Sequence, residues 1–255
     1  MGHVPGALRL DWHKDLFDPN IRDFINGQHF ASLMRRLGIR QNDTVVLYGD
    51  KSQLVGRLRT VGLRPLGHTD IRLLDGGRDA WFLEERPPAS LFAPTQSPTT
   101  PSSNATTTTS ASTVKTYSPH WLLPHHRHSK PRRVRWQHPL SPPLQRRLPP
   151  RTHPHRLQHP WNRAVGPDSR FLPRTTLEDI YDGVCSPDDE HDVITYCTMG
   201  EQASHTWFVL TYLLGCDCAY NYDGSWSEWG TAVRMPIVQG TAPDPSLPLP
   251  LSTRH

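Results

Sequence analysis

The chain has 255 residues, of which 35% are hydrophobic and 26 are proline, so it can hold one large or two medium domains but poorly suits one continuous core. Its net charge of +4 is local, because residues 86–167 contain no Asp or Glu and the remainder is acidic. No apolar run is long enough to span a membrane and no charged-then-apolar leader opens the chain, which predicts a cytoplasmic protein without a membrane partner.

The first third of the chain predicts strands that alternate with helices. A turn and a short strand at 2–12 precede an amphipathic helix at 28–37, which Gly38 ends. Buried strands are expected at 44–48 and 71–74. This alternation is typical of a parallel sheet that helices cover on both faces.

The middle of the chain has a different composition. Residues 94–118 are rich in Ser, Thr and Pro, which is typical of a disordered linker. Residues 119–160 are rich in His, Arg and Pro, so a basic binding arm for nucleic acid or an acidic partner is one interpretation of this tract. Composition alone does not distinguish such an arm from a tract without function, and we expect no nucleic-acid partner.

A strand, a short loop and a helix are predicted around Cys197. The apolar run from Val193 to Tyr196 predicts a strand that ends at the cysteine, and Ser204 is expected to begin a helix that runs to Gly215. A loop at a helix N-terminus directs backbone N–H groups and the positive end of the helix dipole inward, which favours a thiolate. Cys197 is therefore a candidate nucleophile, and an inert buried cysteine is the alternative.

The other cysteines are Cys185, Cys216 and Cys218, and they form neither a CxxC pair nor a disulfide ladder. This usage predicts a reducing compartment. Cys216 and Cys218 lack a second pair of ligands, so no metal site is expected.

Four residues recur in the two halves of the chain with identical spacing, which indicates an internal repeat. The first copy has Tyr48, Gly67, Asp75 and Trp81, and the second has Tyr196, Gly215, Asp223 and Trp229. Directly after the tyrosine, the second copy has Cys197 where the first has Gly49. The chain is therefore two copies of one α/β unit, and the second carries the candidate nucleophile.

These motifs resemble those of the tandem-domain rhodaneses, a family of thiosulfate sulfurtransferases. The resemblance depends on Gly-His-Val-Pro-Gly-Ala at 2–7, Leu-Leu-Asp-Gly-Gly at 73–77, Tyr-Cys with its loop at 196–203 and Asp-Gly-Ser-Trp at 223–226. It implies an α/β fold of two tandem rhodanese-like domains, each a parallel sheet flanked by helices, with a catalytically silent first domain. It also implies that Cys197 takes a sulfane sulfur from thiosulfate, holds it as a persulfide and passes it to cyanide or another thiophilic acceptor.

The resemblance implies that the loop after the cysteine binds the donor, mainly through backbone N–H groups. Its residues are Thr198, Met199, Gly200, Glu201, Gln202 and Ala203. Relatives that use thiosulfate usually have basic side chains directly after the cysteine, and relatives that use 3-mercaptopyruvate have small neutral ones. The Thr198-Met199 pair matches neither pattern well, so a 3-mercaptopyruvate sulfurtransferase is an alternative. The related phosphatases have a longer loop closed by arginine, so Ala203 argues against phosphate-ester hydrolysis.

Two segments depart from the repeat. Residues 53–65 should form a buried helix but carry repeated Arg and Gly, whereas their DNA read one base later can encode an amphipathic helix. Residues 151–159, shifted in the same way, can encode a second Gly-His-Ile-Pro motif at the spacing that the repeat requires. We hypothesise that residues 53–65 and about 97–159 are read out of frame, through sequencing error or gene decay. A clean single-frame read of the locus that encodes the printed residues would contradict this hypothesis.

The chain also departs from the family at two further points. It begins inside a motif, so we expect that an N-terminal strand and helix are missing. The family's Asp-Val-Arg strand and substrate-binding arginine have no counterpart in 119–160, although Val134-Arg135 resembles a remnant of that strand.

The expected organisation has four parts. They are an N-terminal domain at 1–93, the linker at 94–118, a C-terminal catalytic domain at 119–234 and a disordered tail at 235–255. We expect a monomer that uses a small-molecule sulfur donor and acceptor, with no cofactor or metal. A catalytically inactive tandem scaffold or a damaged gene product is the alternative to an enzyme.

Overall fold

The computed structural model describes residues 2–21, 23–49, 68, 70–89, 134–137, 151–152, 156–184, 192–233, 235 and 237–239. The chain divides into two compact units, one made of residues 1–114 with 167–170 and the other of residues 115–166 with 171–255. The run 53–65, the expected linker 94–118 and most of the tract 119–160 lie outside the described residues. The frame hypothesis therefore stays a prediction.

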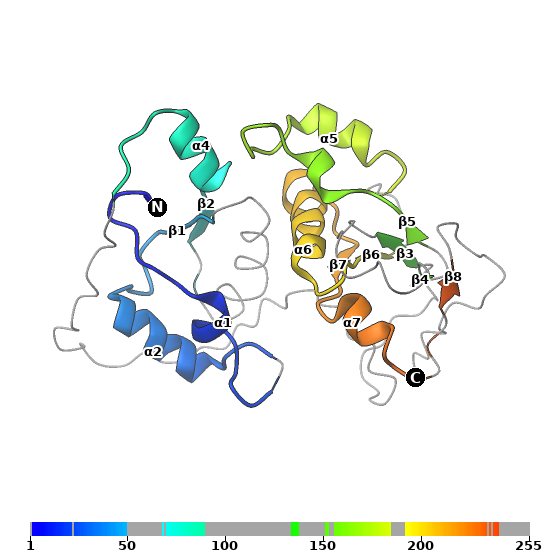
Figure 1. Cartoon of the computed structure of the whole chain (residues 1–255), viewed down its shortest axis with the longest axis horizontal. Coiled ribbons are helices and arrows are strands. Elements are labelled where there is room, and N and C mark those ends of the chain that lie inside the picture. Colours follow the sequence, from blue (N-terminus) through cyan, green and yellow to red (C-terminus); the bar gives the residue numbers. More distant parts are fainter. Residues whose placement is uncertain are drawn as a thin grey trace. The chain divides into compact units, whose positions relative to one another are not determined.

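The first unit alternates helices with parallel strands (Figure 1). Its elements in the described part of the chain are α1 (Trp12–Asp15), α2 (Gly27–Leu37), β1 (Val45–Leu47), β2 (Ile71–Leu73) and α4 (Gly77–Leu83). Strands β1 and β2 pair in parallel, with Val46 opposite Arg72. The core is formed by Leu16, Ile25, Phe30, Leu33 and Ile71. The helix predicted at 28–37 and the strands predicted at 44–48 and 71–74 are confirmed to within one residue at each end.

Helix α2 forms where its apolar pattern predicts it, and both of its ends are capped. The Asn26 side chain accepts a hydrogen bond from the backbone N–H of His29 at 3.0 Å. Gly38 takes a left-handed conformation with φ 71°, and its N–H donates to Arg35 O at 3.0 Å. Phe30 and Leu33 are the buried residues of this helix.

The second unit is built on a four-stranded parallel sheet. Its strand order is β5 (Arg156–Leu157), β3 (Val134–Gln137), β6 (Asp192–Thr195) and β7 (Ala219–Asn221). A separate antiparallel pair is formed by β4 (Arg151–Thr152) and β8 (Val238–Gln239). Strand β3 includes Val134 and Arg135, the two residues that resemble a remnant of the family's Asp-Val-Arg strand, and it pairs in parallel with β6.

Helices lie beside this sheet (Figure 1). They are the 3₁₀ helix η3 (Trp161–Ala164), α5 (Arg174–Ile180), α6 (Glu201–Phe208), the π-helix η4 (Val209–Leu213) and α7 (Ser225–Trp229). The α/β class expected from the sequence, with helices around parallel strands, is confirmed in both units. Within the residues that the structure describes, no helix is long and apolar enough to cross a membrane.

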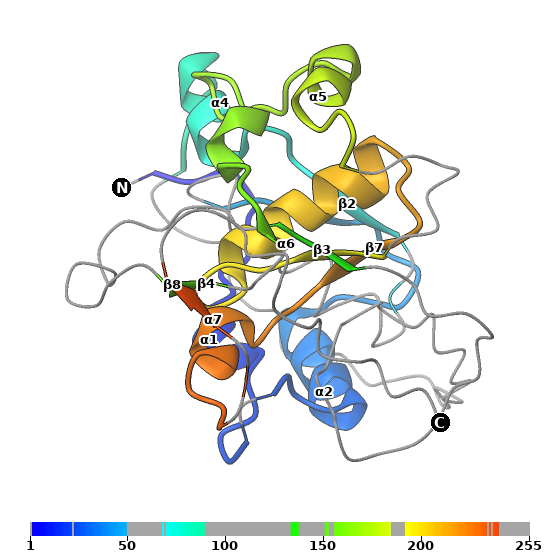
Figure 2. The ribbon, with the colours of Figure 1, turned by 90° about the vertical axis from the view of Figure 1, so that its right-hand side faces the viewer.

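Helix α6, which follows Cys197 in the second unit, is deeply buried. It packs against β6 and β7, as Figure 2 shows, and its residues from Ala203 to Phe208 are all buried. Trp207 Nε1 donates to Ala219 O of β7 at 3.1 Å. The continuation η4 ends at Leu213, whose carbonyl oxygen accepts a hydrogen bond from the Arg174 guanidinium of α5 at 3.0 Å. This positive charge opposes the negative end of the helix dipole.

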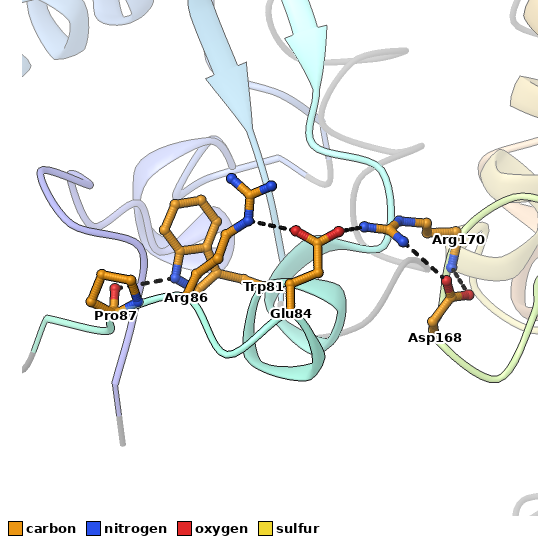
Figure 3. A network of polar contacts seen from close by, with 6 residues as sticks. All are labelled: Trp81, Glu84, Arg86, Pro87, Asp168 and Arg170. Atoms are coloured by element: carbon orange, nitrogen blue, oxygen red, sulfur yellow. Dashed lines mark hydrogen bonds and ion pairs between the residues drawn. The ribbon is translucent and has the colours of Figure 1, made fainter.

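Residues 167–170 lie between η3 and α5 in sequence but belong to the first unit. Figure 3 shows that Arg170 bridges Glu84 and Asp168, while Glu84 also pairs with Arg86. Hydrogen bonds from Arg170 and then Arg86 lower the pKa of Glu84. Ser169 Oγ donates to Asp79 Oδ2 at 2.9 Å, so this segment is tied to α4 by neutral as well as charged contacts.

Candidate functional site

The structure places Cys197 in a tight connection between β6 and α6. Strand β6 ends at Thr195, and α6 begins at Glu201 with Gly200 as its N-cap. The helix start predicted at Ser204 is therefore wrong by one turn. The first turn of α6 holds Glu201, Gln202 and Ala203, and polar or small side chains are tolerated in a first helical turn. The sequence pattern therefore did not distinguish this turn from the preceding loop.

Gly200 makes this tight connection possible. Its φ of 89° belongs to the left-handed region, and a Cβ at this position would lie 2.5 Å from the carbonyl oxygen of Asp223. The same Cβ would lie 2.8 Å from Asp223 Oδ1, so both the turn and the packing require glycine.

The sulfur of Cys197 accepts a hydrogen bond from the loop. The backbone N–H of Gly200 donates to Cys197 Sγ at 3.0 Å, and Cys197 is a free thiol that is 2% exposed. An N–H directed at sulfur next to a helix N-terminus stabilises negative charge on that sulfur. The arrangement thus suits a thiolate, and equally a persulfide anion.

Of the six predicted loop residues, the structure places three in the loop and three in the first turn of α6. Thr198 is half-buried, Met199 is 48% exposed and Gly200 is buried. Glu201 and Gln202 are half-buried, whereas Ala203 is fully buried. The six residues lie together beside Cys197, but the hydrogen bond to its sulfur comes from Gly200.

The start of helix α7 also holds the backbone of Cys197, which the sequence did not predict. The backbone N–H of Cys197 donates to Ser225 Oγ at 3.0 Å, and Ser225 Oγ donates to Tyr222 O at 2.7 Å. The N–H of Trp226 donates to Cys197 O at 3.0 Å. Ser225 and Trp226 belong to the Asp-Gly-Ser-Trp motif. This motif was the sequence signal for the two contacts, but the sequence alone assigned it no role at the cysteine.

Charge near the sulfur comes from backbone dipoles and carboxylates. Residues 192–233 contain no Lys or Arg, whereas Glu201 begins α6 and Asp223 lies against Gly200. An anionic donor would therefore meet the helix dipole and backbone N–H groups in this stretch, without a cationic side chain from it.

Another face of α6 packs into an aromatic cluster. The ring of His205 stacks on Phe171 with centroids 5.0 Å apart and meets Trp161 edge-on at 5.5 Å. Burial lowers the pKa of His205 to about 4, so this imidazole is neutral at neutral pH. Neither of its ring nitrogens has a hydrogen-bond partner among the described residues.

The remaining described cysteines are not equivalent. Cys216 is disulfide-bonded, whereas Cys218 is a buried free thiol whose Sγ lies 3.5 Å from Cys216 Sγ. The cysteine spacing in the sequence did not predict a disulfide at Cys216. A disulfide sulfur is a poor metal ligand, which weakens the case for a Cys216–Cys218 chelate further.

Comparison with known proteins finds one family in both halves of the chain. The model of the rhodanese-like domain matches residues 1–84 and 161–232. The SseA protein of Mycobacterium bovis is 42% identical over 247 residues, which cover 95% of this chain and 82% of that protein. The thiosulfate sulfurtransferase of Corynebacterium glutamicum is 40% identical, with coverage of 94% and 81%. The sulfur carrier protein TtuD of Thermus thermophilus is 36% identical, with coverage of 94% and 86%.

Solved structures agree on the fold. The crystal structure of YnjE superposes with a TM-score of 0.66 at 19% identity, and covers 95% of this chain. The anaerobic ergothioneine biosynthesis enzyme from Chlorobium limicola superposes with a TM-score of 0.67 at 18% identity, and covers 94% of this chain. This chain spans 59% and 61% of the lengths of those two chains.

Proposed function

The chain belongs to the rhodanese-like family and is a sulfurtransferase, and from this premise we propose that Cys197 is its sulfur-carrying residue. The observation that supports the assignment best is the 3.0 Å hydrogen bond from Gly200 N–H to Cys197 Sγ at the N-terminus of α6. Cys216 is disulfide-bonded and so does not offer a thiolate.

The reaction proceeds in two steps. The Cys197 thiolate attacks the sulfane sulfur of thiosulfate, a cysteine persulfide forms, and sulfite leaves with the electron pair of the broken S–S bond. Cyanide or another thiophilic acceptor then attacks the outer sulfur, takes it as thiocyanate or the corresponding product, and releases the thiolate. The Gly200 N–H and the helix dipole oppose the negative charge on sulfur in both steps.

The first unit has Gly49 at the position of Cys197, and we propose that it is catalytically silent. Its Gly49 O accepts from Arg78 N at 3.1 Å, as Cys197 O accepts from Trp226 N at 3.0 Å. The backbone of the site is therefore repeated, but a glycine cannot carry sulfur. The proposed limits of the two domains remain 1–93 and 119–234.

We also propose that the protein works as a monomer in the cytoplasm. The Cys197 thiolate has to escape oxidation between turnovers, which a reducing compartment favours. The two copies of the unit in one chain make a second subunit unnecessary for the repeat. Light scattering after size-exclusion chromatography and cell fractionation test these two statements.

The test of the carrier uses thiosulfate as a label. Incubation with thiosulfate should add about 32 Da to the Cys197 peptide, and cyanide or a reductant should remove this mass. Cys197→Ser should abolish turnover, because a hydroxyl neither ionises near neutral pH nor forms a persulfide. The matched control is Cys218→Ser, which changes the other free thiol and should retain turnover. Sulfur found on Cys218, or turnover retained in Cys197→Ser, would show that the assignment is wrong.

A further inference from the structure

We propose that Ser225 is a positioning residue for Cys197, whose hydroxyl holds the backbone of the nucleophile in register with the Gly200 N–H. This inference rests on the proposed role of Cys197 as the sulfur carrier. It assigns to Ser225 a task in the reaction in addition to its place in a structural motif.

The two copies of the unit share their backbone geometry at this point. The N–H of Leu74 donates to Leu47 O at 2.9 Å in the first copy, and the N–H of Tyr222 donates to Thr195 O at 2.9 Å in the second. Three residues after each of these donors, at positions that the repeat equates, the first copy has Gly77 and the second has Ser225.

Both residues take a left-handed conformation, with φ 55° at Gly77 and φ 49° at Ser225. Glycine adopts such a φ freely, whereas a residue with a Cβ is strained there. The first copy also leaves no room for a side chain, because a Cβ at Gly77 would lie 2.7 Å from Gly49 O. The copy with the cysteine therefore carries a strained serine where the silent copy carries an unstrained glycine.

The hydroxyl explains why a serine suits this position. It accepts the N–H of Cys197 at 3.0 Å and donates to Tyr222 O at 2.7 Å, and Ser225 is fully buried. Without the hydroxyl, the buried N–H of Cys197 would lose its acceptor. The peptide before Cys197 could then rotate toward another acceptor, and such a rotation would move Sγ away from the Gly200 N–H.

Two substitutions separate the hydroxyl from the conformation. Ser225→Ala removes the hydroxyl and keeps the strain, whereas Ser225→Gly removes both and recreates the residue of the silent copy. The control is Thr231→Val, which removes an exposed hydroxyl that follows the same helix and bonds Ser227 O at 2.7 Å. Each protein is measured for kcat, for KM of thiosulfate, for the rate of Cys197 alkylation by iodoacetamide against pH, and for thermal unfolding.

We expect both Ser225 variants to lose about tenfold in kcat, equivalent to about 1.4 kcal/mol, with a smaller change in KM. Their alkylation curves should shift to higher pH, because the thiolate loses its alignment with the Gly200 N–H. Ser225→Gly should unfold at a temperature at or above that of Ser225→Ala, and Thr231→Val should behave as the wild type.

A Ser225→Gly protein with wild-type kcat and a wild-type alkylation curve would overturn the inference, since it would show that the position needs only its turn. A Ser225→Gly protein that fails to fold would also overturn it, because the hydroxyl would then be structural. The proposed function fails separately, if Cys197→Ser retains turnover or thiosulfate labels another residue.

Discussion

Cys197 is held from two directions by residues far apart in sequence. Gly200 supplies the N–H that meets the sulfur, and Ser225 supplies the acceptor for the backbone N–H of the cysteine. Both of these partners have a positive φ, which glycine adopts freely at position 200 and which strains the backbone of Ser225. The electrostatic support of the sulfur then comes from fixed dipoles, which need no reorganisation during the reaction.

The residue directly after the cysteine tests how an anionic donor is held. Thr198 is half-buried and no Lys or Arg occurs in residues 192–233. A charge-assisted hydrogen bond contributes about 1.5–3 kcal/mol, or about 10- to 150-fold in affinity. Thr198→Arg should therefore lower the KM for thiosulfate by about tenfold or more, and the wild-type KM should rise with ionic strength.

The control for this prediction is Thr231→Arg, which adds the same charge at an exposed position outside the loop. It should change the KM for thiosulfate little. The comparison is repeated with 3-mercaptopyruvate, which carries one negative charge in place of two and should gain less from the arginine. A wild-type enzyme that saturates at micromolar thiosulfate, without a salt effect, would contradict the charge argument.

At the scale of elements, helix α6 shows what the sequence could predict. Its existence followed from an apolar segment of helical length, but the complete burial of its polar residues Ser204, His205 and Thr206 did not follow from the pattern. The first residue of α6 could not be predicted, because the sequence does not reveal the left-handed φ of 89° at Gly200 and the first turn contains polar residues. The role of Ser225 was equally hidden, since its partner Cys197 lies far away in the chain.

Strand β3 shows the limits of local composition as a guide. Its residues Val134–Gln137 lie in a basic, proline-rich tract in which the sequence predicted no α/β element apart from a remnant at Val134-Arg135. The parallel ladder places Arg135 opposite Val193 and Gln137 opposite Thr195. Tertiary pairing with a strongly apolar neighbour thus overrides local composition, which is a weak guide to strands.

Helix α6 also carries a histidine whose titration can be measured as stability. The unperturbed pKa is 6.5, and burial between Trp161 and Phe171 lowers the pKa of His205 to about 4 in the folded protein. Between these two values the unfolded chain binds a proton that the folded protein does not bind, so stability falls as the pH falls. The loss is about 1.4 kcal/mol per pH unit and roughly 3 kcal/mol in total, and it is absent above pH 6.5.

His205→Phe should remove this loss and retain the ring in the aromatic cluster. Denaturant unfolding of the second unit at pH 7 and at pH 5 measures the effect, and the difference between the two pH values should be smaller by roughly 2 kcal/mol in the variant. His29→Phe is the control, because His29 is exposed on α2 and should leave the wild-type pH dependence in place. An unchanged pH dependence in His205→Phe would show that other groups cause the acid sensitivity.

At the scale of the whole molecule, the two copies of the unit differ in how they cover equivalent strands. The repeat equates Val46 of β1 with Ile194 of β6. Val46 is 54% exposed, whereas Ile194 is 0% exposed beneath its neighbours in the second unit. The sequence accounts for this difference in part, because residues 53–65 lack the apolar pattern that their counterpart in α6 and η4 has.

This difference predicts unequal costs for matched substitutions. Ile194→Ala should reduce the free energy of unfolding of the second unit by about 2–5 kcal/mol, because it removes a fully buried side chain and leaves a cavity. Val46→Ala should cost the first unit about 0.5 kcal/mol or less, as is usual for an exposed position. Denaturant titration of each variant, followed by probes in each unit, measures the two costs.

The same pair of substitutions tests the frame hypothesis. In a chain whose residues 53–65 are replaced by the one-base-shifted reading, an amphipathic helix would have the sequence needed to cover β1 as α6 covers β6. Val46→Ala should then cost about 1–2 kcal/mol in that chain, while Ile194→Ala should cost what it costs in the printed one. If Val46→Ala costs equally little in both chains, the shifted reading does not restore a cover for this strand, and the argument for a lost frame at 53–65 loses its physical basis.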